Sequence, residues 1–453
     1  MQPLPKEFEE QMKRLLGEAG FFAYLDALNQ PYTRALRVNL LLRPDGTPPC
    51  PIEGLGAPVP WAKGAYFVEG DARPGLSPLH EGGLFYMQEP SALTAVTALD
   101  PQPGERVLDL CAAPGGKSTQ IAALMAGRGL LCCNEPIPSR AQILSRNIER
   151  MGVRNAVVLS AMPDALAPRF PAFFDRILVD APCSGEGMFR RQPEARDEWD
   201  ADAPRRCADR QMEILAQAAK MLRPGGTMVY STCTFNDTEN EGVLKRFLAL
   251  HPEFSLVPFA LPGLPEAKDG YLHLYPHEMR GEGHFVSRLK KADGADEADA
   301  PVQAAPQRKA PARVAAKGKA PAPIALPDVF SDAFAPERLY TAGDALWMLP
   351  EGISIERLSG LRVLRTGLLL AHAEGKRSEP DHALAMALRP EEAARTASLT
   401  QTQALAYQAG ETLSLGDLPG GYTMLCCEGV SLGWGKQAGG LMKNHYPKGL
   451  RRR

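Results

Sequence analysis

VLDLCAAPGGKS, at residues 107–118, is the stretch that decides the predicted fold of this chain. It combines a short apolar run, a turn with two adjacent glycines and the start of a helix that ends at Gly127. Such a turn lets a ligand approach the backbone, with the amides of the helix N-terminus facing it. The spacing matches neither the GxxxxGK phosphate loop nor the GxGxxG dinucleotide turn. A tight strand–helix connection without a ligand is the alternative.

Strand and helix signals alternate outward from this stretch. We predict strands at residues 105–111, 129–135, 156–160, 176–180 and 227–232, and helices at residues 117–127, 138–152 and around 207–222. Repeated strand–helix units imply a parallel sheet with helices on both faces. The predicted fold class is therefore α/β, with a doubly wound sheet over residues 76–290. Ligands of such sheets bind at the carboxyl ends of the strands.

The regions on either side of the sheet differ from it in composition. Residues 1–75 do not follow the alternation, and we expect a small α+β accessory domain that opens with an exposed amphipathic helix. Alanine, proline and charged residues dominate residues 291–325, which predicts a semi-extended linker. Residues 326–453 contain short strand-like runs and predict an α+β domain or a small β-barrel.

The composition is that of an ordinary globular protein, since 44% of the 453 residues are hydrophobic and 23% are charged. The chain has no run of about 18 apolar residues and no signal-peptide core, so we expect a cytoplasmic protein without a membrane partner. The nine cysteines are irregularly spaced and form no CxxC pair. We therefore expect no disulfide framework and no metal site, with the pairs Cys132/Cys133 and Cys426/Cys427 buried and inert.

The net charge of −2 argues against indiscriminate nucleic-acid binding, but it hides local basic patches. The tail KQAGGLMKNHYPKGLRRR, residues 436–453, contains six lysines and arginines and no acidic residue. A second basic stretch lies at residues 190–210, where Glu194, Asp197 and Glu198 are among the carboxylates that interrupt it. For the tail, a contact with phosphate groups and a solvated, disordered segment both remain open.

An acidic residue, Glu135, follows the second predicted strand of the sheet. In nucleotide-binding α/β folds, an acid at this place accepts hydrogen bonds from ribose hydroxyls. The alternative, an exposed loop carboxylate, is weakened because Glu135 stands at the expected position after the glycine turn. A ligand that has a ribose but needs no phosphate loop indicates S-adenosylmethionine as the cofactor.

Two cysteines follow candidate strands: Cys183 in DAPCSGEG and Cys233 in STCT. If the strands are neighbours, they lie about 4.8 Å apart and both thiols can face one small target. Carbon 5 of cytosine attacks a methyl donor only after a thiolate adds to carbon 6, with an acid near N3 and later assistance to release. Cys233, Asp180 and Cys183 meet these needs. For each cysteine, a small buried hydrophobe is the alternative.

LDLCAAPGGKST, DAPCSGEGMFR and STCTFNDTENE resemble the cofactor, release-cysteine and nucleophile motifs of the NOL1/NOP2/Sun family of RNA cytosine-C5 methyltransferases. RVN at residues 37–39, YMQEPSA at 86–92 and YPHEMRGEGHFVSRLKK at 275–291 are also similar to family patterns. The resemblance covers about residues 20–290. It implies a Rossmann-type methyltransferase fold that follows a small N-terminal domain.

The resemblance also implies roles for individual residues. By position, Cys233 is the nucleophile, Cys183 promotes product release and Asp180 assists at N3. Lys117 is implied to line the active site. The residues implied to lie at S-adenosylmethionine are Cys111, Ala112, Ala113, Pro114, Gly115, Gly116, Lys117, Glu135, Arg140 and Asp180. The family often has an aspartate just after the third strand, but Asp164 comes about two residues late in LSAMPDAL, so it is a candidate adenine contact that departs from the pattern.

The C-terminal region resembles the bacterial branch that modifies small-subunit ribosomal RNA, the F-type 16S enzymes. The similar stretches are EPDHALAMAL at residues 379–388 and SLGWGKQAGGLMKNHYPKGLRR at 431–452. In that branch a PUA-like RNA-binding domain follows the catalytic body, and the implied partner is 16S rRNA in the 30S subunit. Trp434, between Gly433 and Gly435, is either a stacking side chain or a structural corner.

The resulting hypothesis is an S-adenosylmethionine-dependent enzyme that methylates cytosine C5 in 16S rRNA. The alternatives are a tRNA methyltransferase with the same chemistry and a non-catalytic RNA-binding ribosome-assembly factor with a vestigial site. The resemblance ties the Thr-Cys motif to RNA, which disfavours a DNA cytosine enzyme. The chain lacks the Asn/Asp-Pro-Pro-aromatic tetrapeptide of amino-group methyltransferases. Nothing in the sequence demands more than a monomer.

Overall fold

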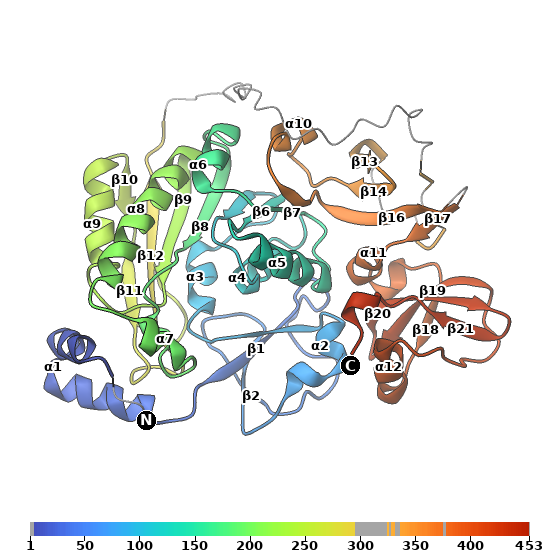
Figure 1. Ribbon diagram of the computed structural model, residues 1–453, viewed down its shortest axis with the longest axis horizontal. Coiled ribbons are helices and arrows are strands. Elements are labelled where there is room, and N and C mark those ends of the chain that lie inside the picture. Colours follow the sequence, from blue (N-terminus) through green and yellow to red (C-terminus); the bar gives the residue numbers. More distant parts are fainter. Residues whose placement is uncertain (1–3, 295–323, 326–327, 331–335, 375–376, 453) are drawn as a thin grey trace.

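The computed structural model describes residues 4–294, 324–325, 328–330, 336–374 and 377–452. A central sheet lies in the middle of the molecule, with the N-terminal region below it and two small C-terminal sheets to its right (Figure 1). Most of the linker that we predicted at residues 291–325 lies outside the described residues.

Four antiparallel strands form the N-terminal sheet, in the order β2-β3-β1-β4. The elements of this region, with η for 3-10 helices, are α1 (Lys6–Leu28), β1 (Arg34–Val38), β2 (Leu55–Pro58), β3 (Ala65–Val68), η1 (Pro74–Leu76), α2 (Pro78–Glu81) and β4 (Phe85–Gln88). β4 pairs with β1 although it lies beyond residue 75, where we expected this domain to end. The N-terminal sheet therefore extends to Gln88.

The first helix, α1, packs one face against the body of the protein. It is kinked at Gly17, where φ is 67°. Phe8 is fully buried, and its ring centroid lies 4.9 Å from that of Phe189 and 5.8 Å from that of Trp199. The helix has the expected amphipathic pattern. The expectation that it is exposed is wrong for its apolar face, which carries Phe8 and is buried. The covering residues come from a distant part of the chain, which the local pattern does not reveal.

Nine strands form the central sheet, in the order β10-β12-β9-β8-β5-β6-β7-β15, with β11 attached to β12. They are β5 (Arg106–Asp109), β6 (Leu130–Asn134), β7 (Ala156–Leu159), β8 (Phe174–Asp180), β9 (Leu222–Thr232), β10 (Phe254–Leu256), β11 (Tyr271–Leu274), β12 (His284–Lys291) and β15 (Val363–Arg365). β5 to β9 run parallel, as predicted. The prediction missed both edges, where β10, β11, β12 and β15 pair antiparallel.

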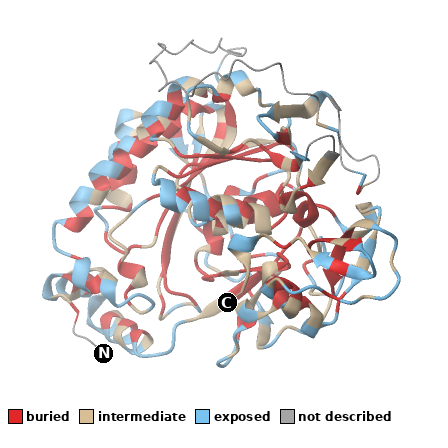
Figure 2. Cartoon of the chain, turned by 45° about the vertical axis from the view of Figure 1, so that its right-hand side comes forward, coloured by how far each residue is buried: buried red, intermediate tan, exposed pale blue. Residues whose placement is uncertain are grey.

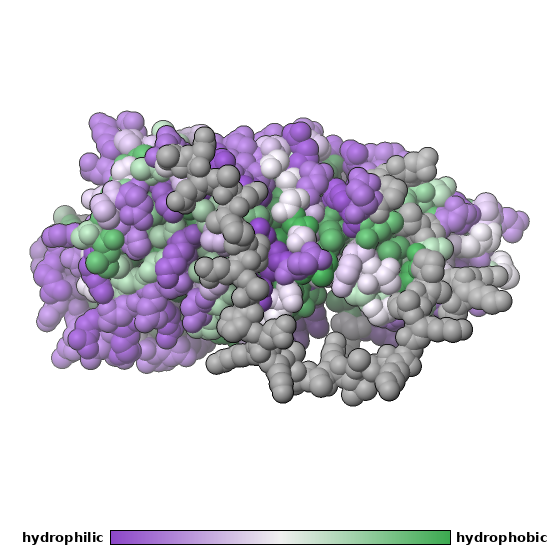
Figure 3. Space-filling model, turned by 90° about the horizontal axis from the view of Figure 1, so that it is seen from above, coloured by the Kyte–Doolittle hydropathy of each residue, from purple (hydrophilic) through white to green (hydrophobic). Residues whose placement is uncertain are grey.

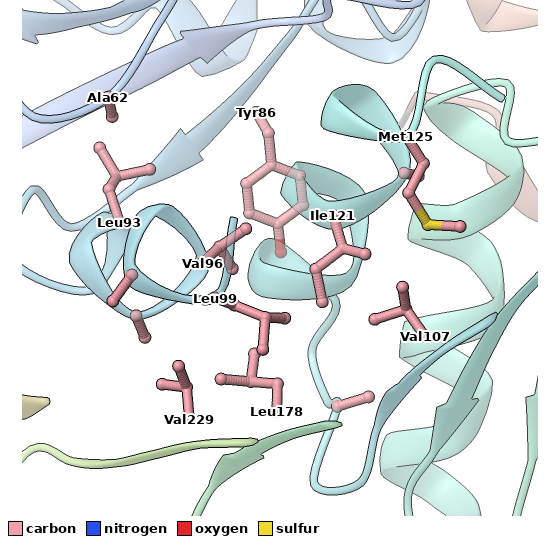
Figure 4. Packing of buried hydrophobic residues seen from close by; sticks show 14 of the residues in the cluster. Ala62, Tyr86, Leu93, Val96, Leu99, Val107, Ile121, Met125, Leu178 and Val229 are labelled. Atoms are coloured by element: carbon pink, nitrogen blue, oxygen red, sulfur yellow. The ribbon is translucent and has the colours of Figure 1, made fainter. Parts of the chain in front are cut away.

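Helices cover both faces of the central sheet. Successive side chains along each strand point to opposite faces, and on each face they form an apolar cluster with the helices. On one face, Val107 and Leu178 pack beneath helices α3 to α5, including Ile121 of α4 (Figure 4). On the other face, Leu108 and Ile177 pack against α6, α8 and α9. The helices around the sheet are α3 (Leu93–Leu99), α4 (Gly116–Leu124), α5 (Pro138–Arg150), α6 (Pro163–Leu166), η2 (Ala167–Arg169), η3 (Glu186–Met188), α7 (Glu194–Glu198), α8 (Ala203–Met221) and α9 (Glu241–Leu250). The doubly wound prediction is confirmed.

The C-terminal region contains two four-stranded sheets, β13-β14-β16-β17 and β18-β19-β20-β21 (Figure 1). Its elements are η4 (Pro336–Arg338), β13 (Leu339–Ala342), β14 (Ala345–Met348), α10 (Ile355–Leu358), β16 (Leu368–Glu374), β17 (Arg377–Pro380), α11 (His382–Ala387), η5 (Pro390–Glu392), β18 (Thr396–Ser398), α12 (Gln401–Ala409), β19 (Gly421–Cys427), β20 (Val430–Ala438), β21 (Leu441–Asn444) and η6 (Lys448–Leu450). β15 leaves this region and joins the central sheet, with Val363 opposite Leu159.

The basic tail folds back on the protein as far as Arg452. Its Nη2 atom donates a hydrogen bond to the carbonyl oxygen of Leu76 at 2.6 Å. The alternative of a disordered tail is therefore wrong for the described residues 436–452. Trp434 is 2% exposed, and its Nε1 donates to the Asp381 carbonyl at 2.9 Å, so this tryptophan is a structural corner.

The two adjacent cysteine pairs, Cys132/Cys133 and Cys426/Cys427, are buried, and burial raises the pKa of each thiol, as the inert interpretation requires. Among the described residues, no group of His, Cys, Asp and Glu side chains could hold a metal ion. No helix in the described ranges is long and apolar enough to cross a membrane. Most residues of the central strands β5 to β9 are buried (Figure 2). Seen from above, hydrophilic side chains cover most of the left-hand side of the molecule, which carries α8 and α9 (Figure 3).

Candidate active site

Cys183 and Cys233 lie together just beyond the carboxyl ends of β8 and β9. The two strands are parallel neighbours, with Asp180 opposite Ser231, so the condition for both thiols to face one target is met. The two Sγ atoms are 3.3 Å apart. The hydrogen bond to Cys233 and burial raise the pKa of Cys183 well above its usual value. Cys183 therefore keeps its proton at neutral pH and can donate it to the sulfur of Cys233.

Asp180 is held by hydrogen bonds on both carboxylate oxygens. Lys117 Nζ donates to Oδ2 at 2.7 Å, and Ser231 Oγ donates to Oδ1 at 2.8 Å. Burial alone would raise the pKa of Asp180, but Lys117 and His284 together outweigh it and hold the pKa well below its usual value. Asp180 is thus a carboxylate at neutral pH. The assistance of Asp180 at N3 stays a prediction, and the group that would give it in this structure is a carboxylate.

Lys117 places a positive charge beside the two cysteines. Burial lowers the pKa of its ammonium group, but the charges of Asp180 and Cys233 outweigh this effect and raise it. Lys117 therefore stays protonated at neutral pH. A positive charge near a cysteine stabilises its thiolate, which is the nucleophilic form. The structure thus brings together all four residues that we predicted to be catalytic.

His284 is a site residue that sequence reasoning missed. It is 3% exposed, and its Nε2 atom lies 3.6 Å from Oδ1 of Asp180. This nitrogen has no hydrogen bond of good geometry within the described part of the chain. His284 reaches the site because β12 pairs with β9, where Phe285 lies opposite Thr232. The motif GEGHF was noted as a family pattern, but the strand pairing that directs His284 to Asp180 is not visible in it.

Two buried glutamates connect the loops that carry the cysteines. Glu239 accepts hydrogen bonds from the Ser184 nitrogen at 3.0 Å and from the side chains of Asn236 and Gln211 at 2.8 Å each. Burial raises the pKa of Glu239, although these bonds oppose the rise. Both loops are therefore fixed relative to each other through one carboxylate.

Glu186 makes a second connection between the same loops. It accepts hydrogen bonds from the backbone nitrogens of Phe235 at 2.8 Å and Asn236 at 3.0 Å. Gln11 of α1 donates to its other oxygen at 2.9 Å. The first helix therefore supports the catalytic loops. Glu186 and Glu239 stand inside the quoted motifs, but nothing in the sequence assigned them this role.

The predicted cofactor loop, Cys111 to Gly116, joins β5 to α4 at the same edge of the sheet. Gly115 caps α4 with φ 112°, and a Cβ there would lie 3.2 Å from Leu144, so a larger residue is disfavoured. The Ala112 nitrogen donates to the Asn134 carbonyl at 2.8 Å, and Arg140 donates to the Ala113 carbonyl at 3.2 Å. Hydrogen bonds with β6 and α5 thus fix the loop. The first backbone N–H groups of a helix have no hydrogen-bond acceptor within that helix.

Glu135 lies at the carboxyl end of β6 and is 3% exposed. Its Oε1 accepts a hydrogen bond from the Ile137 nitrogen at 3.0 Å, and its Oε2 lies 3.5 Å from Nη1 of Arg140. The apolar side chains of Ile137 and Met162 are 49% and 62% exposed beyond β6 and β7. Sequence reasoning missed both, because exposure of an apolar residue depends on the fold. Asp164 is exposed on α6.

Arg37 supports the cofactor loop from the N-terminal domain. Its side chain is 1% exposed, and it donates to Thr119 Oγ1 at 2.8 Å and to the Gly116 carbonyl at 3.3 Å. Burial lowers its pKa to about 10, so it remains charged at neutral pH. This contact joins the RVN motif to the helix that follows the glycine turn.

The residues at this edge fit S-adenosylmethionine. Asp109 beneath the loop is buried, and its Oδ1 has no hydrogen-bond partner within the described residues, whereas Ser118 donates to Oδ2 at 2.6 Å. Burial raises the pKa of Asp109 to about 7, although the bond from Ser118 opposes this rise. In S-adenosylmethionine, the ribose hydroxyls match the carboxylate acceptors of this edge, and the amino-acid group matches the helix N-terminus. The purine matches the exposed apolar side chains.

Comparison with protein-family models covers nearly the whole chain. The model of the 16S rRNA methyltransferase RsmB/F matches residues 96–290. The model of the N-terminal domain of 16S rRNA methyltransferase RsmF matches residues 4–90. The models of the RsmF rRNA methyltransferase first C-terminal domain and of the methyltransferase RsmF PUA domain match residues 327–388 and 394–452. These two ranges correspond to the two C-terminal sheets.

Individual proteins agree with this result. Ribosomal RNA small subunit methyltransferase F from Erwinia tasmaniensis is 34% identical over 98% of this chain and 96% of its own length, and its counterpart from Enterobacter sp. (strain 638) is 35% identical over 98% and 95%. A solved methyltransferase homolog from Pyrococcus horikoshii is 30% identical, with a TM-score of 0.54 over 63% of this chain and 95% of that one. NSun6 from the same organism, solved with SFG, is 23% identical with a TM-score of 0.55 over 64% and 99%, and shows the shared fold. This chain therefore belongs to the 16S rRNA methyltransferase RsmB/F family.

Proposed function

We propose that this chain transfers a methyl group from S-adenosylmethionine to carbon 5 of a cytosine in 16S rRNA, through a covalent bond between Cys233 and carbon 6. The observation that carries the proposal is the 3.3 Å separation of the Cys183 and Cys233 sulfurs beside the Lys117–Asp180 pair. Methylation of an amino group needs no thiol, whereas carbon 5 becomes nucleophilic only after a nucleophile adds to carbon 6. Relatives named as small-subunit rRNA methyltransferases support the choice of RNA.

In the first step, the Cys233 thiolate adds to carbon 6 of the cytosine. The target base must leave its stack to reach the sulfur. The Lys117 ammonium stabilises the thiolate before the attack. As electron density moves into the ring, N3 takes up a proton that the Lys117 ammonium passes on through the carboxylate of Asp180, and this carboxylate then accepts a hydrogen bond from the resulting N–H. Lys117 and Ser231 fix that carboxylate in place.

In the last step, the bond between Cys233 and carbon 6 breaks once a base has removed the proton from carbon 5. The departing sulfur carries negative charge. Cys183 keeps its proton at neutral pH and lies 3.3 Å from that sulfur, so its S–H donates to the leaving group. This assigns a release role to Cys183 and a nucleophilic role to Cys233.

When bound, S-adenosylmethionine supplies the electrophilic methyl group. Glu135 would accept hydrogen bonds from the ribose hydroxyls, and Ile137 and Met162 would contact the purine. The loop of residues 111–117 and the N-terminus of α4 would hold the amino-acid end, and Arg140 fixes this loop through the Ala113 carbonyl. Asp164 remains a candidate for the amino group of the adenine.

One chain contains Cys183, Cys233, Lys117 and Asp180, so we propose a monomer that acts on 16S rRNA or the 30S subunit in the cytoplasm. The test is transfer of labelled methyl groups to purified 30S subunits, naked 16S rRNA and bulk tRNA, followed by digestion to nucleosides. Label in 5-methylcytidine from 30S or 16S material supports the proposal. Label in tRNA alone would keep the chemistry and reject the ribosomal substrate. No label in any RNA would favour a non-catalytic assembly factor.

A further inference from the structure

Three neighbouring grooves on the protein surface share lining residues. The first groove, about 540 Å³, lies between residues 28–32 and the segment that carries Arg190 and Arg196. The second groove, about 630 Å³, shares Pro31 and Tyr32 with the first. The third groove, about 340 Å³, shares Arg73 with the second. We call this surface the track.

One end of the track lies next to the catalytic loops. The Thr33 nitrogen donates to Oε1 of Glu282 at 3.1 Å, and Arg190 Nε donates to the other oxygen of Glu282 at 2.8 Å. Glu282 stands two residues before His284, which contacts Asp180. Arg190 follows η3, where the Gly187 nitrogen donates to the Cys233 carbonyl at 2.8 Å. The backbone around Tyr32 is therefore connected to both halves of the active site.

The other end of the track reaches the C-terminal region. The third groove is lined by residues 51–53 and 73–79 of the N-terminal domain and by Gln401 of α12. Beside it, Arg452 of the basic tail donates to the Leu76 carbonyl. The track therefore runs from the catalytic loops, across the N-terminal sheet, to the domain that matches the PUA model.

Arginine is more frequent than carboxylate along the track. Five arginines and three carboxylates line it, whereas the whole chain has 51 lysines and arginines against 53 acidic residues. Arg73 is exposed, and its guanidinium has no hydrogen-bond or ion-pair partner among the residues that the structure describes. Tyr32 is 45% exposed where the first two grooves meet. An exposed aromatic ring among arginines is the arrangement that binds single-stranded nucleic acid, by base stacking and phosphate contacts.

We propose that the track binds single-stranded RNA flanking the target cytosine, with Tyr32 stacked on a base and Arg73 bound to a phosphate. The inference rests on the proposed function and specifies how its substrate is held. A cytosine that leaves its stack also unstacks its neighbour, and an exposed aromatic ring can accept that base. Phosphate contacts then fix the register of the strand relative to Cys233.

The first test compares Tyr32→Ala with Tyr32→Phe, which keeps the ring. Binding to an unmodified 16S rRNA transcript is measured without cofactor, and KM and kcat are measured with it. Tyr32→Ala should bind about tenfold more weakly, as expected for the loss of one stacked base. KM for RNA should rise by the same factor while kcat is unchanged, and Tyr32→Phe should resemble the wild type. Phe22→Ala, at a 60% exposed ring outside the track, is the matched control.

The second test replaces Arg73 by alanine and measures the salt dependence of RNA binding. Loss of one phosphate contact on a single strand should lower the slope of log K against log salt by about 0.7. Arg246→Ala on α9, where the side chain is 52% exposed and paired with Asp209, should leave the slope unchanged.

The two proposals fail in different ways. If both Tyr32→Ala and Arg73→Ala bind RNA as tightly as the wild type, the proposal that the track binds RNA is overturned, even if the wild type makes 5-methylcytidine. Weakened binding by both variants, together with absence of 5-methylcytidine in the wild-type product, would overturn the proposed function and support the track. Thermal melting of each variant shows whether it is folded before binding is compared.

Discussion

The backbone nitrogen of Ser184 donates a hydrogen bond to the carboxylate of Glu239 at 3.0 Å, and the Ser184 hydroxyl donates to the same group. Ser184 directly follows Cys183, whereas Glu239 belongs to the loop that begins with Cys233. The distance between the two sulfurs is therefore fixed by a buried carboxylate that takes no part in the reaction. Glu239 is a positioning residue.

Replacement of Glu239 by glutamine should reduce both stability and turnover. The amide would place an N–H group against donors from Ser184, Asn236 or Gln211, and one buried donor would lose its acceptor. Such a loss costs about 1–3 kcal/mol of the free energy of unfolding. Urea denaturation measures the stability, and Glu213→Gln, at an exposed position of α8, is the control. An unchanged midpoint together with unchanged kcat would contradict the positioning role.

The two catalytic cysteines should give opposite phenotypes when replaced. Cys233→Ala removes the nucleophile and should abolish methyl transfer. Cys183→Ala removes the donor to the departing sulfur, so a covalent RNA–protein adduct should accumulate and shift the band on a denaturing gel. Cys207→Ala, at a half-buried thiol on α8, is the control and should do neither. Normal turnover by Cys183→Ala without an adduct would reject its release role.

Lys117→Met should shift the pH dependence of the reaction. Burial raises the pKa of Asp180, and Lys117 is the strongest influence that lowers it. Without the ammonium group this pKa rises, so the carboxylate becomes protonated at a higher pH. The acidic limb of the pH–rate profile should therefore move to higher pH, and kcat should fall by about 10²-fold. Lys245→Met, at an exposed position on α9, should leave the profile where it is.

His284→Phe should produce a smaller shift of the acidic limb in the same direction. His284 is the next strongest influence, after Lys117, that lowers the pKa of Asp180. Its Nε2 atom lies 3.6 Å from Oδ1 of Asp180. Phenylalanine keeps the volume and apolar packing of the ring but not the nitrogen. KM for RNA should be unchanged, because His284 is 3% exposed and cannot contact the strand. A profile identical to that of the wild type would show that the histidine only fills space.

Glu135→Ala should raise KM for S-adenosylmethionine and leave KM for RNA unchanged. Its loss removes the acceptor for the ribose hydroxyls and also the partner of Arg140. We expect at least a tenfold effect, which corresponds to about 1.4 kcal/mol of binding free energy. Asp164→Ala tests the remaining candidate in the same assay. An effect of Asp164→Ala as large as that of Glu135→Ala would establish the adenine contact.

The parallel core of the sheet was predictable because each of its strands is a continuous apolar run followed by a turn or helix signal. Cys183, Cys233, Lys117 and Asp180 come together for the same reason, since the carboxyl ends of parallel strands share one edge. Local patterns therefore sufficed for every residue that stands at the end of its own strand or at the start of the following helix.

Residues that reach the site through long-range pairing were not predictable. His284 depends on β12 lying antiparallel to β9, and Arg37 depends on the N-terminal sheet docking on α4. The alternation of apolar residues in a strand shows which side chains are buried, but it does not identify the neighbouring strand. The burial of Phe8 on α1 was missed for a similar reason, because Phe189 and Trp199 cover it from far along the chain.

The pairing of Val363 with Leu159 affects how the chain completes its fold during synthesis. β7 is buried along its whole length, and without β15 its backbone N–H and C=O groups would form an open sheet edge, which is a template for pairing with other chains. Translation reaches β15 only after the complete catalytic half and the following linker sequence have emerged. A nascent chain therefore carries an uncapped sheet until residues 363–365 leave the ribosome, and a protein truncated at residue 290 should aggregate rather than work as a separate catalytic domain.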